Sequence, residues 1–499
     1  MFQFKSLSKG VALAVGLMAC GVCGAQVIVP RTLNMQQVVE LAQENSIASM
    51  SNRNTFVSRY WSYRSYKAEM LPSLNLSADL VQFDRSLVAL QDYQTGAISY
   101  RTNYNLTNSA RVYVSQNVPW TGGNVSLTTS LRRLDQYSPM RSTTYYAAPI
   151  SLSYTQSIWG YNRFKWSRKT EPKNYELAKR QYIESMEQVC QTAVAYFWNY
   201  VRDKEDYERA VKTFEDSKRL FEAGQTRFAM GTITRDNLMQ IESSMLMDSL
   251  SVNSKKVTLR TSLNRLCSYI GYKEDTELNL IIDYNIPDIT LDYEDVLERA
   301  LENSTFSLNQ EISYIQTESS VAQAKANRGL SASIHANFGM SGSADELKQT
   351  MVQLQENEQI GITLSIPIVD WGLARGRVRM AEAQALTTRN SLEQAMIDKR
   401  QNLLTQVMQF NNQRSQCEIS ARAAQLAEES YQLALQNFGS GSMTMTQLDQ
   451  LKDKRDNALS TYVGNVQSFW SFYFQIRQTT LYDYATGTDI SAEFDKLVK

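Results

Sequence analysis

The placement of proline constrains the fold of this chain more than any other feature of its sequence. The 499 residues include eight prolines, and none lies between Lys173 and Asn285 or between Ile368 and Lys499. Proline is excluded from helix interiors because it lacks a backbone N–H and clashes with the preceding turn. We therefore expect long helices over Lys173–Ala229 and Leu373–Phe438, with lengths of about 85 and 100 Å at 1.5 Å per residue.

Helices of this length extend beyond any single globular core, so they must pack sideways on other helices. The last proline-free stretch carries an apolar stripe at three- and four-residue spacing, which fits coiled-coil-like packing. The stripe consists of Leu448, Leu451, Ala458, Tyr462, Val466, Phe469, Tyr473 and Ile476. We expect these side chains to fill the space between helices.

Other segments alternate apolar and polar residues with a period of two. In Gln359–Ile366, Ile360, Ile362 and Leu364 fall on one face of a strand, while glycine, threonine and serine fall on the other. Residues 74–80, 150–155 and 334–341 repeat the pattern. On the pattern alone, any half-buried antiparallel sheet explains it.

Three further observations favour a membrane β-barrel over an ordinary sheet. The segments are about ten residues long, which is the length that a tilted membrane strand needs. Their polar faces are small and mostly uncharged, as suits a water-filled lumen. Aromatic residues gather near the strand ends and are candidates for an interfacial belt: Trp120, Trp159, Tyr161, Trp166 and Trp371.

The N-terminus has the pattern of an export signal. Lys5 and Lys9 form a basic region before the apolar run Val11–Ala19, and small residues end at Ala25. We expect cleavage after Ala25. The sequence before Cys20 also resembles a lipobox, so a lipidated Cys20 is the alternative. Both alternatives take the chain across the inner membrane.

An internal repeat organises the chain. The segment Thr32–Ser46 aligns with Thr290–Ser304 at a constant offset of 258, with eight identical positions out of fifteen. Each copy opens a helix with a capping residue and an apolar 3–4 pattern. Strands, a long helix, a glycine-containing break and a second long helix follow each copy. We place the boundaries at 1–25 for the signal peptide, 26–285 and 286–485 for the two repeats, and 486–499 for a tail.

Two strands in each half give four strands, which cannot close a barrel. An open edge in lipid leaves backbone groups unpaired at several kcal/mol each, so we expect the chain to oligomerise, with three copies giving twelve strands. The first half holds one more strand pair around the turn Thr121-Gly122-Gly123. This pair forms an extracellular ribbon, which we favour, or widens the barrel.

Composition excludes several classes of protein. The formal net charge is zero, which removes the electrostatic case for nucleic-acid binding. Cys190, Cys267 and Cys417 lie far apart without metal-ligand spacing, so we expect buried thiols. His335 is the only histidine and falls on the polar face of a strand. Because catalytic and phosphate-binding motifs are absent from the sequence, we expect neither an enzyme nor a bound cofactor or metal.

The repeated helix–strand–helix layout, the Pro-x-x-Asp-Trp-Gly exit from the strands and two glycine-containing helix breaks resemble the TolC family of outer-membrane efflux proteins. The breaks are FAMGTITRDNL (228–238) and FGSGSMTMTQL (438–448), and QSIWGYNRFKWSRKTEP (156–172) resembles the strand exit of Bacteroides-type members. The resemblance covers residues 31–485.

This resemblance implies a mixed α+β membrane protein. Three chains share a twelve-stranded outer-membrane barrel of four strands each, which continues into a long α-helical barrel in the periplasm of a Gram-negative bacterium. A periplasmic adaptor joins the helical tips to an inner-membrane transporter, and substrates leave through the tunnel. The implied function is export of small molecules such as drugs and toxic compounds. Protein or peptide secretion through the same tunnel is the alternative, and a structural coiled-coil surface protein is a more distant one.

The resemblance also assigns site residues by position. The first tip contains Gly231, Thr232 and Ile233, followed by Asp236, and the second contains Gly441, Ser442 and Met443. The resemblance implies that both tips contact the adaptor. The alternative is that their glycines only end helices, as turn chemistry requires.

The gate departs from the family pattern. Many members place carboxylates six and nine residues after the second tip glycine, but this chain has Gln447 and Gln450 there. A strongly acidic, cation-binding ring is therefore not expected. We expect instead a polar gate in which Asp449, Asp453 and Arg455 take part.

Overall fold

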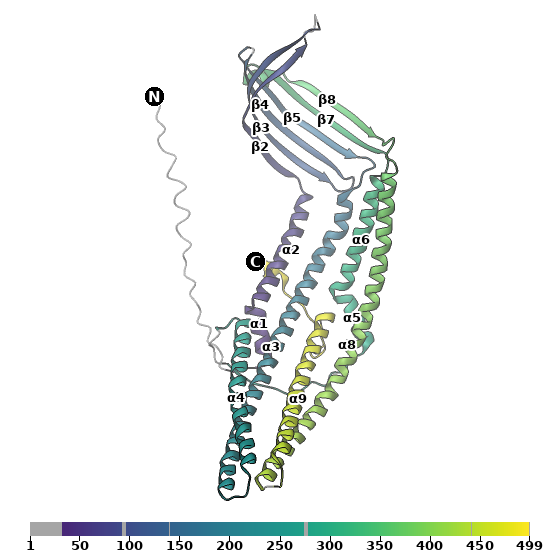
Figure 1. The fold of residues 1–499 in the computed structure, drawn as a ribbon. Coiled ribbons are helices and arrows are strands. Elements are labelled where there is room, and N and C mark those ends of the chain that lie inside the picture. The colour runs from purple at the N-terminus through teal and green to yellow at the C-terminus, as the bar shows by residue number, and fades with distance from the viewer. Residues whose placement is uncertain (1–31, 92–95, 139, 274–277, 441, 499) are drawn as a thin grey trace, which may run out of the picture.

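The computed structural model describes residues 32–91, 96–138, 140–273, 278–440 and 442–498. One sheet lies at one end of the elongated chain, and long helices run away from it (Figure 1). The predicted signal peptide, including Cys20 and Ala25, lies outside the described residues.

Six antiparallel strands form the sheet in the order β2-β3-β4-β5-β7-β8. They are β2 (Ser73–Gln91), β3 (Ile98–Val118), β4 (Gly123–Ser138), β5 (Ser142–Ser157), β7 (Ser331–Ala344) and β8 (Gln355–Ser365). The first half of the chain therefore supplies four strands and the second half two. The expectation of about ten residues holds for β8, which has 11, but is wrong for β3, which has 21. The long strand β2 carries two adjacent charged residues, Asp84 and Arg85, between apolar stretches.

The alternation predicted from the sequence runs across five of the six strands in one continuous row. Cross-strand pairing joins one apolar row from β2 to β7, and side chains in such a row share one face. The row is Leu74, Val114, Leu127, Leu152 and Phe338. The other face is polar, and there Ser151 and Ser153 donate hydrogen bonds to Asn337 Oδ1 at 2.8 and 3.1 Å.

The extra strand pair is β3 and β4, and it is part of this sheet. Its turn lies at the helical end, because Gln116 Nε2 donates to the carbonyl of Met70 at 2.8 Å and Asn117 Nδ2 to that of Glu69 at 3.2 Å. The favoured interpretation of an extracellular ribbon is therefore wrong. A strand that descends from the far end of the sheet must turn at the near end.

Eight long or medium helices carry the rest of the described chain. They are α1 (Met35–Asn45), α2 (Ile47–Glu69), α3 (Arg163–Ala229), α4 (Arg235–Tyr269), α5 (Tyr293–Asn303), α6 (Thr305–Ala326), α8 (Leu373–Ser440) and α9 (Met445–Thr480). Helix α3 pairs with α4, α8 pairs with α9, and α3 packs on α9. The predicted helix over Leu373–Phe438 is confirmed with a two-residue extension.

Two helix boundaries differ from the expectations. Helix α3 begins at Arg163 and contains Pro172, so the sequence placed its start ten residues too late. The first helix of each half is broken at a serine, Ser46 or Ser304, which ends one helix and caps the next with its hydroxyl. A serine hydroxyl that accepts a backbone N–H favours a new helix start over continuation.

An apolar core joins the helices at mid-length. Phe197 and Trp198 of α3 meet Phe410 of α8 and Phe469 of α9, all almost fully buried. The predicted stripe of α9 supplies much of this core, which confirms its role. Cys190, Cys267 and Cys417 are buried thiols, as expected.

Short elements complete the described chain. They are β1 (Thr32–Leu33), which pairs with β6 (Asn279–Leu280), the short helix α7 (Leu347–Thr350), the pair β9 (Tyr482–Asp483) and β10 (Thr488–Asp489), and α10 (Phe494–Val498). Phe494 packs on Phe56 of α2 with 5.2 Å between ring centroids, which holds the C-terminal segment against the bundle. Among the described helices, none is both long enough and apolar enough to cross a membrane.

Candidate functional site

The first tip is the tight turn between α3 and α4. Gly231 adopts φ 72°, and a Cβ there would meet open space, so the turn requires glycine for its backbone conformation. Thr232 N donates to the carbonyl of Arg227 at 2.9 Å. Thr232 and Asp236 are exposed, and Ile233 is half-buried. The predicted tip residues therefore lie together at the end of the helix pair farthest from the sheet (Figure 1).

The second tip lies beside the first. Gly441 is outside the described residues, but Ser442 is exposed and Met443 packs against the small core of Tyr431, Ala434 and Leu448. The Arg227 guanidinium of α3 donates to the carbonyl of Phe438 on α8 at 3.5 Å, and to that of Gly439. This arginine therefore joins the two tips within one chain.

Arg455 is the most deeply buried of the predicted gate residues. Its side chain has no exposed surface, and its guanidinium carbon lies 3.9 Å from the centroid of the Tyr431 ring on α8. Its Nη2 donates to Thr213 Oγ1 of α3 at 2.9 Å and to Asp456 Oδ1 at 2.8 Å. One side chain of α9 thus connects three helices.

Lys452 makes a second connection one turn earlier on α9. Its Nζ lies 3.1 Å from Asp248 Oδ1 of α4 and 3.4 Å from Asp449 Oδ1. Ser244 of α4 donates to Asp449 Oδ1 at 3.5 Å, and Ser217 of α3 donates to Asp248. The structure therefore brings Asp449 into contact with α4 through Ser244, and Lys452, which the sequence did not single out, adds an ion pair with Asp248 of α4.

Further polar contacts cross the same seam between the two helix pairs. Lys212 of α3 lies 3.1 Å from Glu428 of α8, and Arg209 Nη1 donates to the carbonyl of Asp456 at 3.1 Å. A polar cavity of about 380 Å³ lies in this seam, with Asp453 on its wall. The polar part of the seam therefore lies between the apolar core at mid-length and the small apolar core of Tyr431, Ala434 and Leu448 near the tips.

The charges of the seam stabilise one another. Burial acts to raise the pKa of Glu428, but hydrogen bonds from Gln432 and Lys212 and the charges of Lys212 and Arg455 outweigh it and hold the pKa below its usual value. Burial acts to lower the pKa of Lys452, and Asp248 and Asp449 outweigh it and raise the pKa. Both groups are therefore held in their charged forms by contacts within the seam.

The remaining predicted gate residues are placed differently. Gln447 accepts hydrogen bonds from Thr444 N at 3.0 Å and caps α9 together with that threonine. Gln450 and Asp453 are exposed. The structure brings together Asp449, Arg455 and, through the cavity, Asp453, whereas Gln447 belongs to the helix cap.

Sequence reasoning missed Lys452, Asp248, Thr213, Glu428 and Tyr431. One signal was present, because Arg455 lies in a series of otherwise apolar residues that are seven positions apart. The other members of the series are Leu448, Tyr462, Phe469 and Ile476. A charged residue at a coiled-coil core position indicates a specific polar contact. The partners of Arg455 on α3 and α8 could not be identified in the same way, because nothing in the sequence around them marks them as its contacts.

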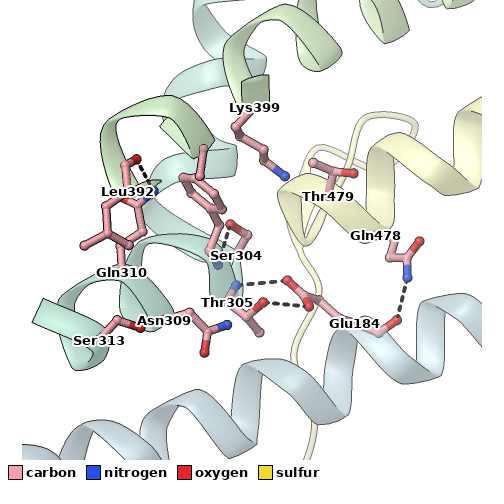
Figure 2. A pocket seen from close by; sticks show the side chains of 12 residues that line it. Glu184, Ser304, Thr305, Asn309, Gln310, Ser313, Leu392, Lys399, Gln478 and Thr479 are labelled. Atoms are coloured by element: carbon pink, nitrogen blue, oxygen red, sulfur yellow. Dashed lines mark hydrogen bonds between the residues drawn. The ribbon is translucent and has the colours of Figure 1, made fainter. Parts of the chain in front are cut away.

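A separate pocket of about 380 Å³ lies where α5 meets α6 (Figure 2). Glu184 of α3 accepts hydrogen bonds from Thr305 N and Oγ1, both at 2.9 Å, and so caps α6 from outside. Lys399 of α8 lines the pocket. Burial lowers the pKa of Lys399, against the charge of Glu184, which acts to raise it. These contacts hold the break between α5 and α6 against α3. The pocket lies apart from the polar seam.

The predicted interfacial aromatics lie at the junction of sheet and helices. Trp120 and Trp159 are exposed on turns, and Trp371 is 96% exposed with φ 52° just before Gly372 at φ 84°. Asp370 accepts hydrogen bonds from Gly372 N and Ala374 N and so caps α8. Tyr161 bonds Ser319 at 2.5 Å, and Trp166 is half-buried on α3. Three of the five aromatic side chains therefore project freely.

Several solved outer-membrane proteins share this fold. The Campylobacter jejuni CmeC outer membrane channel matches with a TM-score of 0.65 at 14% identity, over 93% of this chain and 88% of that one. The Vibrio cholerae outer membrane protein VceC matches with a TM-score of 0.61 at 14% identity, over 91% of this chain and 96% of that one. The open state of the Neisseria gonorrhoeae MtrE outer membrane channel matches with a TM-score of 0.57 at 12% identity, over 90% of this chain and 89% of that one. No curated protein sequence is similar enough to this chain to count as a relative.

The sequence comparison agrees with the fold. Residues 296–467, which include the second strand pair, all of α8 and most of α9, match the family described as "Outer membrane efflux protein". The family and the solved structures are channel proteins, so the expectation that the chain is not an enzyme is confirmed. Residues 296–467 therefore resemble the outer membrane efflux protein family, and the whole chain shares the fold of solved outer-membrane channels.

Proposed function

We propose that this protein is the outer-membrane channel of a tripartite efflux system, through which small molecules pass from an inner-membrane transporter to the outside. One observation carries the proposal: a sheet with one apolar face continues directly into helices of up to 68 residues. Such helices are about 100 Å long at 1.5 Å per residue. They suit a tunnel that starts at a membrane and crosses the periplasm.

A homotrimer is supported by apolar stripes on the two outer helices of the bundle. Leu246, Leu250 and Val257 of α4 are more than half exposed and lie four and seven residues apart, which places them on one side of the helix in a heptad pattern. Helix α8 carries a similar exposed series on its free side: Ile397, Leu404, Met408, Ile419, Leu426 and Leu433. Apolar stripes of this length require a partner helix, and α8 of a neighbouring copy suits α4.

The tips are the proposed contact with a periplasmic adaptor. Gly231, Thr232, Ile233 and Asp236 of the first tip, with Ser442 and Met443 of the second, lie at the end of the chain opposite the sheet (Figure 1). Gly441, which lies outside the described residues, is proposed for the same contact. Thr232 and Ser442 are exposed, so their side chains are available for contact with another protein. A channel held in the outer membrane by its sheet presents these turns to proteins arriving from the inner membrane.

The polar seam near the tips is the proposed gate. Asp449, Arg455 and the cavity-lining Asp453 act there with Lys452 and Asp248, and the contacts hold the α8–α9 pair against the α3–α4 pair. Polar contacts can exchange partners with water when they separate, whereas an apolar core cannot without a larger cost. This difference supports a gate that opens at the polar seam while the mid-length core stays packed.

The sheet carries the remaining proposals. Trp120, Trp159 and Trp371 are proposed to lie at the periplasmic interface of the membrane, with Tyr161 and Trp166 just below it. Signal cleavage after Ala25, or lipidation of Cys20, stays a prediction.

Bilayer recording of detergent-extracted protein tests the proposal. We expect a heat-modifiable trimer that forms single channels in a planar bilayer, with low conductance that rises when the charge of Asp449 is reversed. A monomer without conductance would refute the channel. A conducting trimer in which Asp449→Lys changes nothing would refute only the role of Asp449 in the gate.

A further inference from the structure

The sheet of one chain ends in two open edges. Strand β2 pairs only with β3 and β8 only with β7 among the described strands. Both edge strands carry apolar side chains that are mostly exposed, with Leu76 72% and Ile362 69% exposed. Where such side chains lie in lipid, no water satisfies the free N–H and C=O groups of the edge, and each costs several kcal/mol. Both edges therefore need a protein partner.

We propose that β2 of one copy pairs with β8 of the next, so that the barrel of the trimer contains eighteen strands rather than twelve. This inference rests on the proposed trimer, because six strands in each of three copies make eighteen. Strand β2 leaves the helical end of the sheet and β8 returns to it. Their contact between copies is therefore antiparallel, as in every other pair of the sheet.

The strands β3 and β4 belong to the barrel wall. Their pairing is continuous from Val118↔Gly123 to Asn105↔Gln136, and β4 pairs with β5 along most of its length. The apolar row from Leu74 to Phe338 crosses both strands without a gap. If the pair left the wall, its apolar face would meet water and β2 would lose the partner that it has in the structure.

The turn between β3 and β4 is fixed to the helices. Asn162, the capping residue of α3, donates from Nδ2 to the carbonyls of Pro119 at 3.1 Å and Trp120 at 3.2 Å. A Cβ on Gly122 would lie 3.0 Å from Asn162 Cγ, so the two segments are in close contact. The extra pair therefore spans the same height as its neighbours.

The circumference of the helical layer supports the same count. Each chain has four helix–strand connections, from α2 to β2, β5 to α3, α6 to β7 and β8 to α8. Twelve helices spaced 8–10 Å apart make a ring of about 100–120 Å. Strands about 4.8 Å apart and tilted about 40° give a circumference of about 113 Å for eighteen and about 75 Å for twelve.

An eighteen-stranded wall therefore continues the helical ring without narrowing. Its diameter between backbones is about 36 Å, against about 24 Å for twelve strands. A barrel of this size leaves an aqueous channel. The sheet then imposes no size limit on the exported molecule, and selection by size falls to the helical gate.

Cysteine pairs at the two edges test the contact. Asn75 or Ser77 of β2 and Thr363 or Ser365 of β8 are exchanged for cysteine in pairs, and the full-length trimer is oxidised in detergent. We expect at least one pair to give covalent dimers and trimers on a denaturing gel. Ser126→Cys of β4 with Thr363→Cys is the matched control, because β4 lies inside the sheet and gives no link between copies.

Two results would overturn the inference. One is a conducting trimer in which every edge pair stays unlinked while Ser77→Cys links to Ser153→Cys of β5 in the same chain, which is the pairing of a twelve-stranded barrel. The other is a strand count of twelve in an electron cryomicroscopy map of the trimer. Loss of both trimer and conductance would instead refute the proposed function.

A shortened chain gives an independent measurement of width. Deletion of residues 85–141, with a short turn joining Asp84 to Ser142, removes the extra pair and keeps every strand direction. Asn337→Cys reports access to the lumen through maleimide–polyethylene glycols of increasing size added from the sheet side. We expect the full chain to accept larger polymers than the shortened one. Equal limits in two conducting trimers would contradict the wider barrel.

Discussion

The guanidinium of Arg455 lies 3.9 Å from the centroid of the Tyr431 ring, in a position with no exposed surface. A buried arginine on an aromatic face gains about 2 kcal/mol from the ring when it is desolvated. Burial also raises the pKa of Tyr431, so the ring stays neutral. The contacts of Arg455 with Thr213 of α3 and Tyr431 of α8 form only while α3, α8 and α9 stay together, so they depend directly on the packing of these helices.

Replacing Arg455 by methionine should loosen the seam. The change keeps a long apolar side chain but removes the hydrogen bonds to Thr213 and Asp456, at a cost of about 1–3 kcal/mol. We expect closed-channel conductance to rise several-fold in planar bilayers. Lys454→Met, one residue away and exposed, is the control and should leave conductance unchanged. Equal conductance in both variants would remove Arg455 from the gate.

The pair of Lys452 and Asp248 offers a charge-swap experiment. Lys452→Glu and Asp248→Lys each place like charges about 3 Å apart in the seam, and each should raise conductance. The double variant restores an opposite-charge pair between α9 and α4. We expect it to return most of the way to the wild-type conductance. Additive effects of the two changes would show that the residues act independently.

Much of the fold could be predicted because its signals are local. Missing prolines indicated α8, period-two alternation indicated β7 and β8, and the turn at Gly122 indicated the extra strand pair. The position of that pair could not be predicted, because it depends on Gln116 and Asn117 reaching helix ends more than forty residues away.

The candidate site was predictable only in part for the same reason. The tips around Gly231 carry their own turn chemistry, whereas Arg455 depends on Thr213, Glu428 and Tyr431 of other helices. Pro172 misled the prediction of α3, because the helix gains enough from packing along its length to tolerate one missing N–H.

Asn162 should contribute measurably to the junction of sheet and helices. Asn162→Ala removes the cap of α3, worth about 1 kcal/mol, and two hydrogen bonds to the β3–β4 turn, worth about 1 kcal/mol each. We expect the temperature at which the trimer dissociates on heating in detergent to fall by several degrees. Asn54→Ala on the exposed face of α2 serves as control. An unchanged temperature for Asn162→Ala would show that the strands hold the turn without it.

The buried thiols should be inert in the folded channel. Burial raises the pKa of Cys190 to about 12 and that of Cys417 to about 11, so the reactive thiolate is scarce at neutral pH. We expect neither residue to react with a maleimide until the protein is denatured, as followed by mass spectrometry. Rapid labelling of Cys417 in the native state would indicate that α8 and α9 separate spontaneously at that level.

Acid should loosen the gate through Glu428. Its pKa lies below the usual 4.5 in the folded chain, so its contacts with Lys212 and Arg455 contribute fully above that value and are lost as the pH falls through the lower folded value. We expect closed-channel conductance to rise below about pH 4.5, the usual pKa of the group. Glu428→Gln should show raised conductance at neutral pH and a weaker response to acid. An undiminished acid response in that variant would assign the effect to other carboxylates, because the glutamine at 428 cannot titrate.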